Sequence, residues 1–75
     1  MPTLVRLAGG KVAMYANDHG EPHFHVETPD GRCSVSIERL AVIAGSVKPA
    51  VLRQALTWAK ENLGLLRRRW KELNP

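Results

Sequence analysis

Several residue types that define whole classes of small proteins are scarce in this 75-residue sequence. It contains one cysteine, one tyrosine and one phenylalanine, and a single thiol cannot form an internal disulfide. No apolar run approaches the roughly 20 residues that a membrane-spanning helix needs. The N-terminal residues also lack the basic region and the long apolar segment of a signal peptide. The sequence therefore argues against a disulfide-rich secreted domain and predicts a cytoplasmic protein with no membrane segment.

Negative charge is scarce only in the second part of the chain. Residues 1–45 contain four Lys or Arg and five Asp or Glu, a net charge of −1, whereas residues 46–75 contain seven and two, a net charge of +5. The overall charge of +4 therefore arises from the C-terminal segment. A chain of this length fits one domain, residues 1–75, and buries only about 60% of its unfolded surface. It has little stability to spare, so a ligand, a partner or an oligomer is compatible with its size.

The order of patterns along the chain predicts an α+β domain with the outline ββββα. Runs at 4–7 and 12–16 flank a Gly-Gly connector, and runs at 23–28 and 32–38 flank Pro29-Asp30-Gly31; both connectors are typical of tight hairpin turns. Four antiparallel strands in two hairpins follow, and residues 40–44 add a fifth edge strand or a turn. The sheet should thus lie between about residues 3 and 44.

A different periodicity begins at Pro49. Apolar residues recur at alternating spacings of four and three, which places them on one face of a helix: Leu52, Leu56, Ala59, Leu63, Leu66, Trp70 and Leu73. We expect one long helix over residues 49–73, packed on one face of the sheet. Gly64 lies inside this stripe and predicts a kink or break there, because glycine costs about 1 kcal/mol relative to alanine in a helix.

All three histidines fall within seven positions, on the entry to the third predicted strand. Alternate residues of a strand share a face, so Phe24, Val26 and Cys33 should lie on the apolar side. The rings of His23 and His25 then point jointly away from the helix-covered core. Cys33 is expected to be a small buried hydrophobe rather than a nucleophile. Counting from the second turn places His25 near position 34 and His23 near position 36, which are both serines.

The same strand phase assembles a candidate catalytic set on the polar face. Imidazole acts as acid, base or metal ligand near neutral pH, and a neighbouring carboxylate can orient its tautomer or bind backbone amides in a turn. Polar residues on the outward face of a sheet are ordinary, so the close spacing of the histidines carries the prediction. The candidate catalytic residues are His19, His23, His25, Asp18, Tyr15 and Arg6.

A metal is a second use for the histidine cluster. Structural zinc sites usually have four ligands, and Cys33 is predicted to face the other way, so we expect no cofactor. If a divalent metal such as zinc is bound, its ligands would be His19, His23, His25 and Asp18.

The run Met14-Tyr15-x-x-Asp18-His19-x-x-Pro22-His23-Phe24-His25-Val26, with a Gly-bearing hairpin before it and a helix containing Trp58-Ala59 after it, resembles a known family. It is similar, over nearly the whole chain, to the small bacterial proteins of domain of unknown function 4160. The resemblance implies that the motif aspartate and histidines form the functional site. Members are commonly encoded beside a second small protein, an arrangement interpreted as a toxin–antitoxin pair in which the histidine-motif protein is the toxin. Glu21 stands where the family often has a second proline, which predicts a more flexible loop.

The C-terminal basic cluster comprises Arg67, Arg68, Arg69 and Lys71, interrupted by Trp70. Basic residues with an interleaved aromatic suit phosphate contact and base stacking, or an acidic protein partner such as an antitoxin. The other interpretation is a solvated face favourable to a helix C-terminus, with Trp70 buried on the core stripe.

Two functions follow. The first is a toxin that acts on RNA or on translation by a metal-independent, ribonuclease-like activity, with histidines as general base and acid and Arg6 or the basic helix stabilising phosphate charge. Its partners would be an antitoxin encoded nearby and RNA. The alternative is a non-catalytic module that binds protein or nucleic acid through the polar sheet face and the basic helix.

Overall fold

The sheet is a five-stranded antiparallel meander. The structure is a computed structural model that describes residues 2–75. Strands β1 (Thr3–Leu7), β2 (Gly10–Ala13), β3 (His23–Thr28), β4 (Gly31–Ser36) and β5 (Val42–Gly45) follow each other in space in the order of the chain. The predicted α+β class is confirmed, and residues 42–45 form a strand rather than a turn.

The register of the central hairpin agrees with the sequence prediction. His25 lies opposite Ser34 and His23 opposite Ser36. The first hairpin turns at Gly9, whose φ of +87° is readily adopted only by glycine, and a Cβ there would lie 3.3 Å from Val51 of the following helix.

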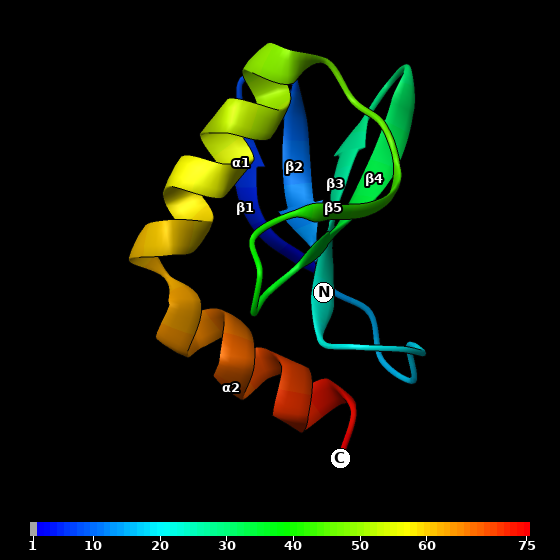
Figure 1. Cartoon of the computed structure of the whole chain (residues 1–75), viewed down its shortest axis with the longest axis vertical. Helices are drawn as coiled ribbons and strands as arrows, with labels where there is room; N and C mark the ends of the chain where they lie inside the picture. Colours follow the sequence, from blue (N-terminus) through cyan, green and yellow to red (C-terminus); the bar gives the residue numbers. More distant parts are fainter. Residues whose placement is uncertain (1) are drawn as a thin grey trace.

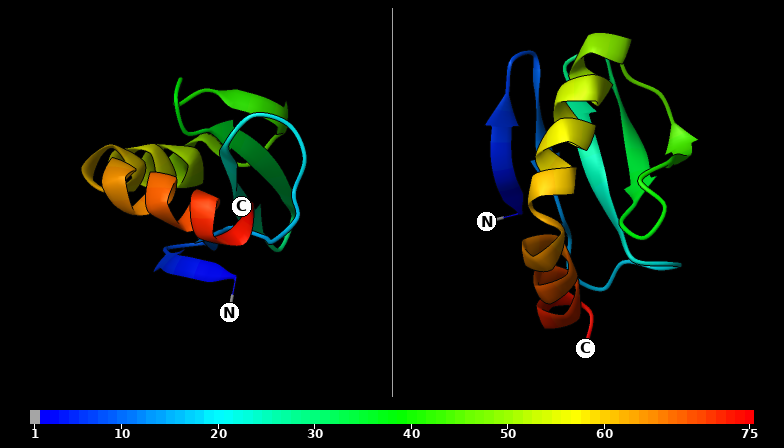
Figure 2. Two further views of the ribbon diagram at one scale, coloured as in Figure 1. Left: turned by 90° about the horizontal axis from the view of Figure 1, so that it is seen from below. Right: turned by 60° about the vertical axis from the view of Figure 1, so that its left-hand side comes forward.

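The core forms between one sheet face and helix α1 (Pro49–Glu61). Figure 1 and the right-hand view of Figure 2 show α1 running along this face. The sheet contributes Val12, Met14, Phe24, Val26, Cys33, Val35 and Ile37 to the core. The helix contributes Val51, Ala55 and Ala59, at a spacing of four, and Leu52 and Leu56 lie at the margin. In α1 the buried positions are thus Val51 and Ala55 in place of the predicted Leu52 and Leu56, whereas Ala59 is buried as predicted.

The C-terminal segment is two helices, so the prediction of one long helix is wrong. Helix α2 (Leu63–Leu73) follows α1 after a break at Asn62, whose backbone has φ −132° and ψ 29°. The Asn62 side chain donates a 2.8 Å hydrogen bond to the Trp58 carbonyl, and its backbone N–H donates to the Ala59 carbonyl. The break therefore lies at an asparagine that caps the end of α1, and Gly64 lies in the first turn of α2.

The break directs α2 past the end of the sheet. In Figure 1, α2 lies below the strands, and the left-hand view of Figure 2 shows the C-terminus beside the loop that joins β2 to β3. Within the described residues, no helix combines the length and apolarity needed to cross a membrane.

Strand β5 forms one edge of the sheet and pairs only with β4. Its residues Val42 and Ile43 are 42% and 43% exposed and are the exposed large hydrophobics of the described chain. This edge carries no charged side chain.

Candidate functional site

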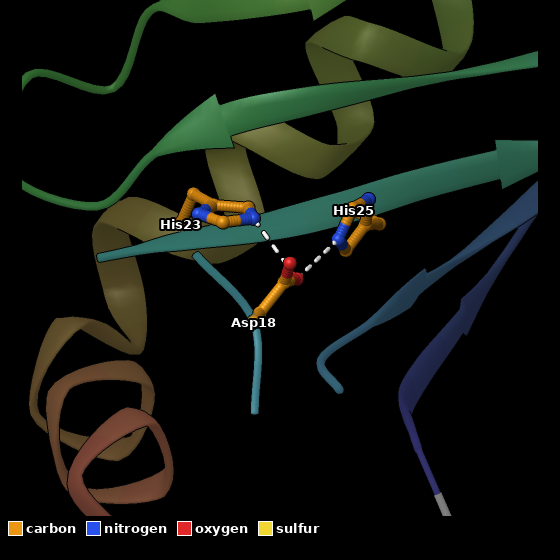
Figure 3. Close-up of side chains that lie close together, drawn as sticks. All are labelled: Asp18, His23 and His25. Carbon is orange, nitrogen blue, oxygen red and sulfur yellow. Dashed lines mark hydrogen bonds and ion pairs between the residues drawn. The ribbon is translucent and has the colours of Figure 1, made fainter. Parts of the chain in front are cut away.

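One carboxylate oxygen joins two of the three histidines. Asp18 Oδ2 lies 3.0 Å from His23 Nε2 and 2.9 Å from His25 Nε2. Figure 3 shows the carboxylate, which comes from the β2–β3 loop, between two rings that project from the same side of β3. The ring centroids are 5.1 Å apart with an interplanar angle of 74°. The prediction that the rings at 23 and 25 point jointly to one side is confirmed. We call these three residues the Asp-His-His cluster.

The remaining polar atom of each cluster member also has a partner. His23 Nδ1 lies 2.7 Å from the Glu21 carbonyl, which only accepts hydrogen bonds, so this nitrogen carries a proton. His25 Nδ1 lies 3.4 Å from the Ser34 hydroxyl. Asp18 Oδ1 accepts a hydrogen bond of 3.1 Å from the backbone N–H of His19. The orientations of both rings and of the carboxylate are therefore fixed from outside the cluster.

The loop that carries Asp18 is held by the C-terminus of the chain. Asn74 Oδ1 accepts a 2.8 Å hydrogen bond from the Asp18 backbone N–H, and the Asn17 N–H donates to the Leu73 carbonyl at 3.4 Å. Asn17 adopts a left-handed φ of 58°, which asparagine tolerates better than most residues. The end of α2 thus determines where the Asp18 carboxylate lies.

His23 is covered by α2, which corrects one prediction. The sequence predicts that both rings face away from the helical segment, but His23 is only 7% exposed and its ring centroid lies 5.0 Å from that of Trp70. The break at Asn62 is the physical cause, because it lets α2 reach around the end of the sheet. Trp70 is partly buried and packs against the core as well as against His23. His25 remains nearer the surface, with its ring 5.2 Å from that of Tyr15.

Glu21 anchors the loop instead of loosening it. Its carboxylate accepts hydrogen bonds from Arg39 Nη2 at 2.7 Å and from the Ser36 hydroxyl at 2.8 Å. The Ser36 side chain is fully buried. The bonds from Arg39 and then from Ser36 lower the pKa of Glu21. The flexibility expected from the absence of a second proline is therefore opposed by this network.

The charge state of Asp18 suits its position. The hydrogen bond from His25 is the largest influence and lowers the pKa of Asp18, and the backbone N–H of His19 acts in the same direction. Burial opposes these effects without overcoming them. Near neutral pH the cluster therefore contains an anionic carboxylate between two imidazoles.

His19 and Tyr15 lie beside the cluster rather than in it. His19 is exposed and offers its backbone amide to Asp18. Tyr15 packs its ring on His25, but its hydroxyl donates a 2.6 Å hydrogen bond to Glu27. That bond is the main cause of the raised pKa of Tyr15.

Arg6 lies toward the other end of the sheet. It pairs with Lys11 across the first hairpin and lines an open pocket of about 900 Å³ with Lys11, Glu27 and Arg32 among others. The structure does not bring Arg6 to the Asp-His-His cluster. The prediction failed because strand phase shows which face of the sheet a residue lies on, but not how far along the sheet it lies.

A shallow pocket of about 380 Å³ opens beside His23. Its lining residues come from the β2–β3 loop and from β3, β4 and β5: His19, Gly20, Glu21, His23, Ser34, Ile43 and Ala44. The Ser34 hydroxyl that faces His25 Nδ1 therefore also lines a space that admits a small group.

The basic cluster lies on α2, whose other side packs on the core. Arg67, Arg68 and Lys71 are exposed. Arg67 lies 3.4 Å from Glu38, and Arg69 lies 3.0 Å from Glu72 on the same helix. Arg68 and Lys71 form no ion pair with a described residue, so their charges face solvent. Trp70, between them in sequence, contacts His23 and links this helix to the cluster.

Sequence reasoning missed Asn74, Glu21 and the contact of Trp70 with His23. Asn74 follows a helical stripe and Glu21 lies in a turn-rich loop, and neither pattern distinguishes a supporting residue from an ordinary polar one. Trp70 was assigned to the stripe correctly, and a break was predicted at Gly64, but the pattern does not show that the break at Asn62 brings Trp70 to His23.

The fold and the site together define a small α+β protein with an Asp-His-His cluster on the face of an antiparallel sheet opposite the core. The family model described as Domain of unknown function (DUF4160) matches residues 9–71. The chain therefore belongs to this family. No curated protein and no solved structure matches this chain.

Proposed function

We propose that this protein is the toxin of a bacterial toxin–antitoxin pair and acts on RNA through the Asp-His-His cluster. The single observation that carries the proposal is the sharing of one Asp18 oxygen by His23 and His25. Such an arrangement holds two imidazoles in fixed orientations beside a pocket, as general acid–base catalysis requires. The toxin role itself comes from the family resemblance and awaits the test below.

RNA is a substrate that this chemistry suits. Its cleavage needs a base for the ribose 2′-hydroxyl and an acid for the leaving oxygen. Asp18 accepts a hydrogen bond from the Nε2–H of His25. In this tautomer the basic atom of His25 is Nδ1, which faces Ser34, a residue that lines the pocket. Asp18 would stabilise the positive charge that His25 acquires when it takes a proton, as the aspartate of a catalytic triad does.

The basic cluster on α2 supports the choice of a polyanion. Arg68 and Lys71 project into solvent from the helix that covers His23. They would neutralise phosphates outside the reacting bond, a contribution that weakens steeply with salt. The same surface fits an acidic antitoxin, which would block the approach of RNA.

Growth after induced expression tests the proposal. We expect wild-type protein to arrest growth, and His25→Gln and His23→Gln to relieve the arrest while circular dichroism shows an unchanged fold. His19→Gln is the matched histidine control, because its ring lies outside the cluster, and it should remain toxic. Coexpression of the neighbouring gene should restore growth. Harmless wild-type protein, or folded His23 and His25 variants that stay fully toxic, would overturn the proposal.

A non-catalytic binding module is the second candidate, favoured by the solvent-facing charges of Arg68 and Lys71. In that case Arg68→Gln with Lys71→Gln abolishes binding to RNA, and His25→Gln leaves it intact. Binding measured at increasing salt should then weaken without any cleavage product on a gel.

A further inference from the structure

We propose that Asp18, His23 and His25 form a three-ligand site for a divalent transition metal such as Zn²⁺. Asp18 Oδ2, His23 Nε2 and His25 Nε2 all lie within 4.8 Å of one another. This inference concerns the same place as the proposed function and deepens it: the use of the metal in a reaction rests on that function, but its binding does not.

The spacing of the ligand atoms suits a metal. Zinc binds imidazole nitrogen and carboxylate oxygen at about 2.0–2.2 Å, so neighbouring ligand atoms of one ion lie roughly 3.0–3.5 Å apart at bond angles from 90° to tetrahedral. The observed separations from Asp18 Oδ2 are 2.9 Å to His25 and 3.0 Å to His23. The two histidine nitrogens lie within 4.8 Å of each other, so rotations of the side chains that draw the two rings together would accept an ion.

The neutral ring of His23 has an unprotonated ligand atom at Nε2. Because Nδ1 donates its proton to the Glu21 carbonyl, the neutral ring presents a lone pair at Nε2 to an Asp18 oxygen. Two electron-rich atoms at 3.0 Å repel each other unless a positive charge lies between them. A second proton on the His23 ring provides that charge in a hydrogen bond to Asp18, and a metal ion shared with His25 as the third ligand provides it equally well.

The outer contacts have the pattern found around metal-binding histidines. Such histidines usually donate their other ring nitrogen to a carbonyl, carboxylate or water, which fixes the tautomer and the orientation of the ring. His23 has the Glu21 carbonyl in this role, and the Ser34 hydroxyl lies 3.4 Å from His25 Nδ1. With a metal at Nε2, His25 Nδ1 would carry the proton and donate to Ser34, which is the opposite tautomer to the one that acts as a base in the proposed function. The free oxygen of Asp18 is held by the His19 backbone N–H. The three ligands are therefore oriented before any ion binds.

Three protein ligands leave at least one coordination position open, which is typical of catalytic rather than structural zinc sites. His23, one of the three ligands, lines a pocket of about 380 Å³ that has space for a water or a phosphate group. In the context of the proposed function, a metal-bound water would replace an imidazole as the base. The site would remain the same, and activity would become sensitive to chelators.

Direct binding to the untagged full-length protein tests the inference. The protein is treated with a chelator, dialysed, and titrated with ZnCl₂ by calorimetry, with MgCl₂ as the comparison ion. We expect one Zn²⁺ per chain and much weaker binding of Mg²⁺, which prefers an all-oxygen, octahedral environment. Asp18→Asn, His23→Gln and His25→Gln should each weaken Zn²⁺ binding by at least 10-fold.

Two control variants separate this site from other zinc-binding groups. His19→Gln removes the exposed imidazole, and Cys33→Ala removes the thiol; both should bind one Zn²⁺ with wild-type affinity. Co²⁺ in place of Zn²⁺ should give a visible spectrum without a thiolate charge-transfer band. Absence of Zn²⁺ binding by folded protein, or equal binding by the His25→Gln variant, would overturn the inference.

The outcome for the metal is independent of the outcome for the toxin. Zinc binding by a protein that does not arrest growth supports the metal site and contradicts the proposed function. Histidine-dependent toxicity in a protein that binds no Zn²⁺ contradicts the metal site and supports the metal-independent reaction.

Discussion

The two faces of strand β3 are held in different ways. On the core face, Phe24 and Val26 are fully buried against apolar neighbours. On the other face, which we call the histidine face, His23 and His25 are held by hydrogen bonds to Asp18. Apolar packing is not directional and tolerates many partners, whereas each contact on the histidine face needs one atom in one place. The core face should therefore determine stability, and the histidine face should determine function.

The largest effect should come from the core face. Phe24→Ala leaves a cavity, and truncations of this kind cost about 3–5 kcal/mol. A domain of this size has a total stability of roughly 4–11 kcal/mol, so much of it would be lost. Urea denaturation followed by circular dichroism measures the change. His25→Ala on the opposite face is the matched variant and should cost clearly less; equal losses would contradict the division between the faces.

The next effect concerns the centre of the histidine face. Asp18→Asn preserves the shape of the side chain but removes the charge that both Nε2 atoms contact. Hydrogen bonds to charged groups contribute about 1.5–3 kcal/mol each, and partial exposure to solvent places the expected loss at the lower end of this range. We expect complete loss of toxicity with the fold retained. Melting temperature and growth arrest, measured on the same variant, check the two parts; loss of the fold would show that this face is needed for stability too.

Acid should weaken the histidine face before the core face. Folding lowers the pKa of Asp18 below its ordinary 3.8 and that of Glu21 below its ordinary 4.5. Their stabilising contributions are therefore complete above the ordinary values and are lost as the pH falls below them. The free energy of unfolding, measured from pH 7 to pH 3, should decrease at the acid end. In the Asp18→Asn, Glu21→Gln double variant this decrease should be smaller, and an unchanged acid slope would show that other carboxylates cause it.

The smallest effect should come from the C-terminal support of the loop. Asn74→Ala removes the acceptor of the Asp18 backbone N–H and costs about 1 kcal/mol. Amide hydrogen exchange should become faster at Asp18, whereas the amide of Val26 on the core face should keep its protection. Equal acceleration at both positions would mean that Asn74 stabilises the whole domain and not the loop.

The strands and the pairing of the central hairpin could be predicted from the sequence, but the position of the helix break could not. The alternation of apolar and polar residues and the residue types of the turns are local features. They predicted the strands, the pairing of His25 with Ser34 and the burial of Cys33, which is 2% exposed in the structure. The helix break was misplaced because Asn62 lowers helix propensity only modestly, whereas Gly64 carries the stronger signal.

The support of the site could not be predicted for a related reason. Asp18 meets Asn74 across 56 positions of the sequence, and this contact exists only because α2 changes direction. Arg6 was placed on the correct kind of face, but its distance along the sheet from His23 depends on the register of β1 with β2. The sequence therefore predicts which side chains share a face, and the tertiary structure decides which of them meet.

The single thiol of the chain offers a natural reporter of conformational opening. Cys33 lies in β4 opposite Gly45 of the edge strand, and burial raises its pKa, so a thiol reagent in solution meets neither an accessible sulfur nor a ready thiolate. Modification must wait until the core between the sheet and α1, in which Cys33 is buried, opens. The rate of labelling at a given reagent concentration then measures how often this part of the native protein opens, with no engineered probe.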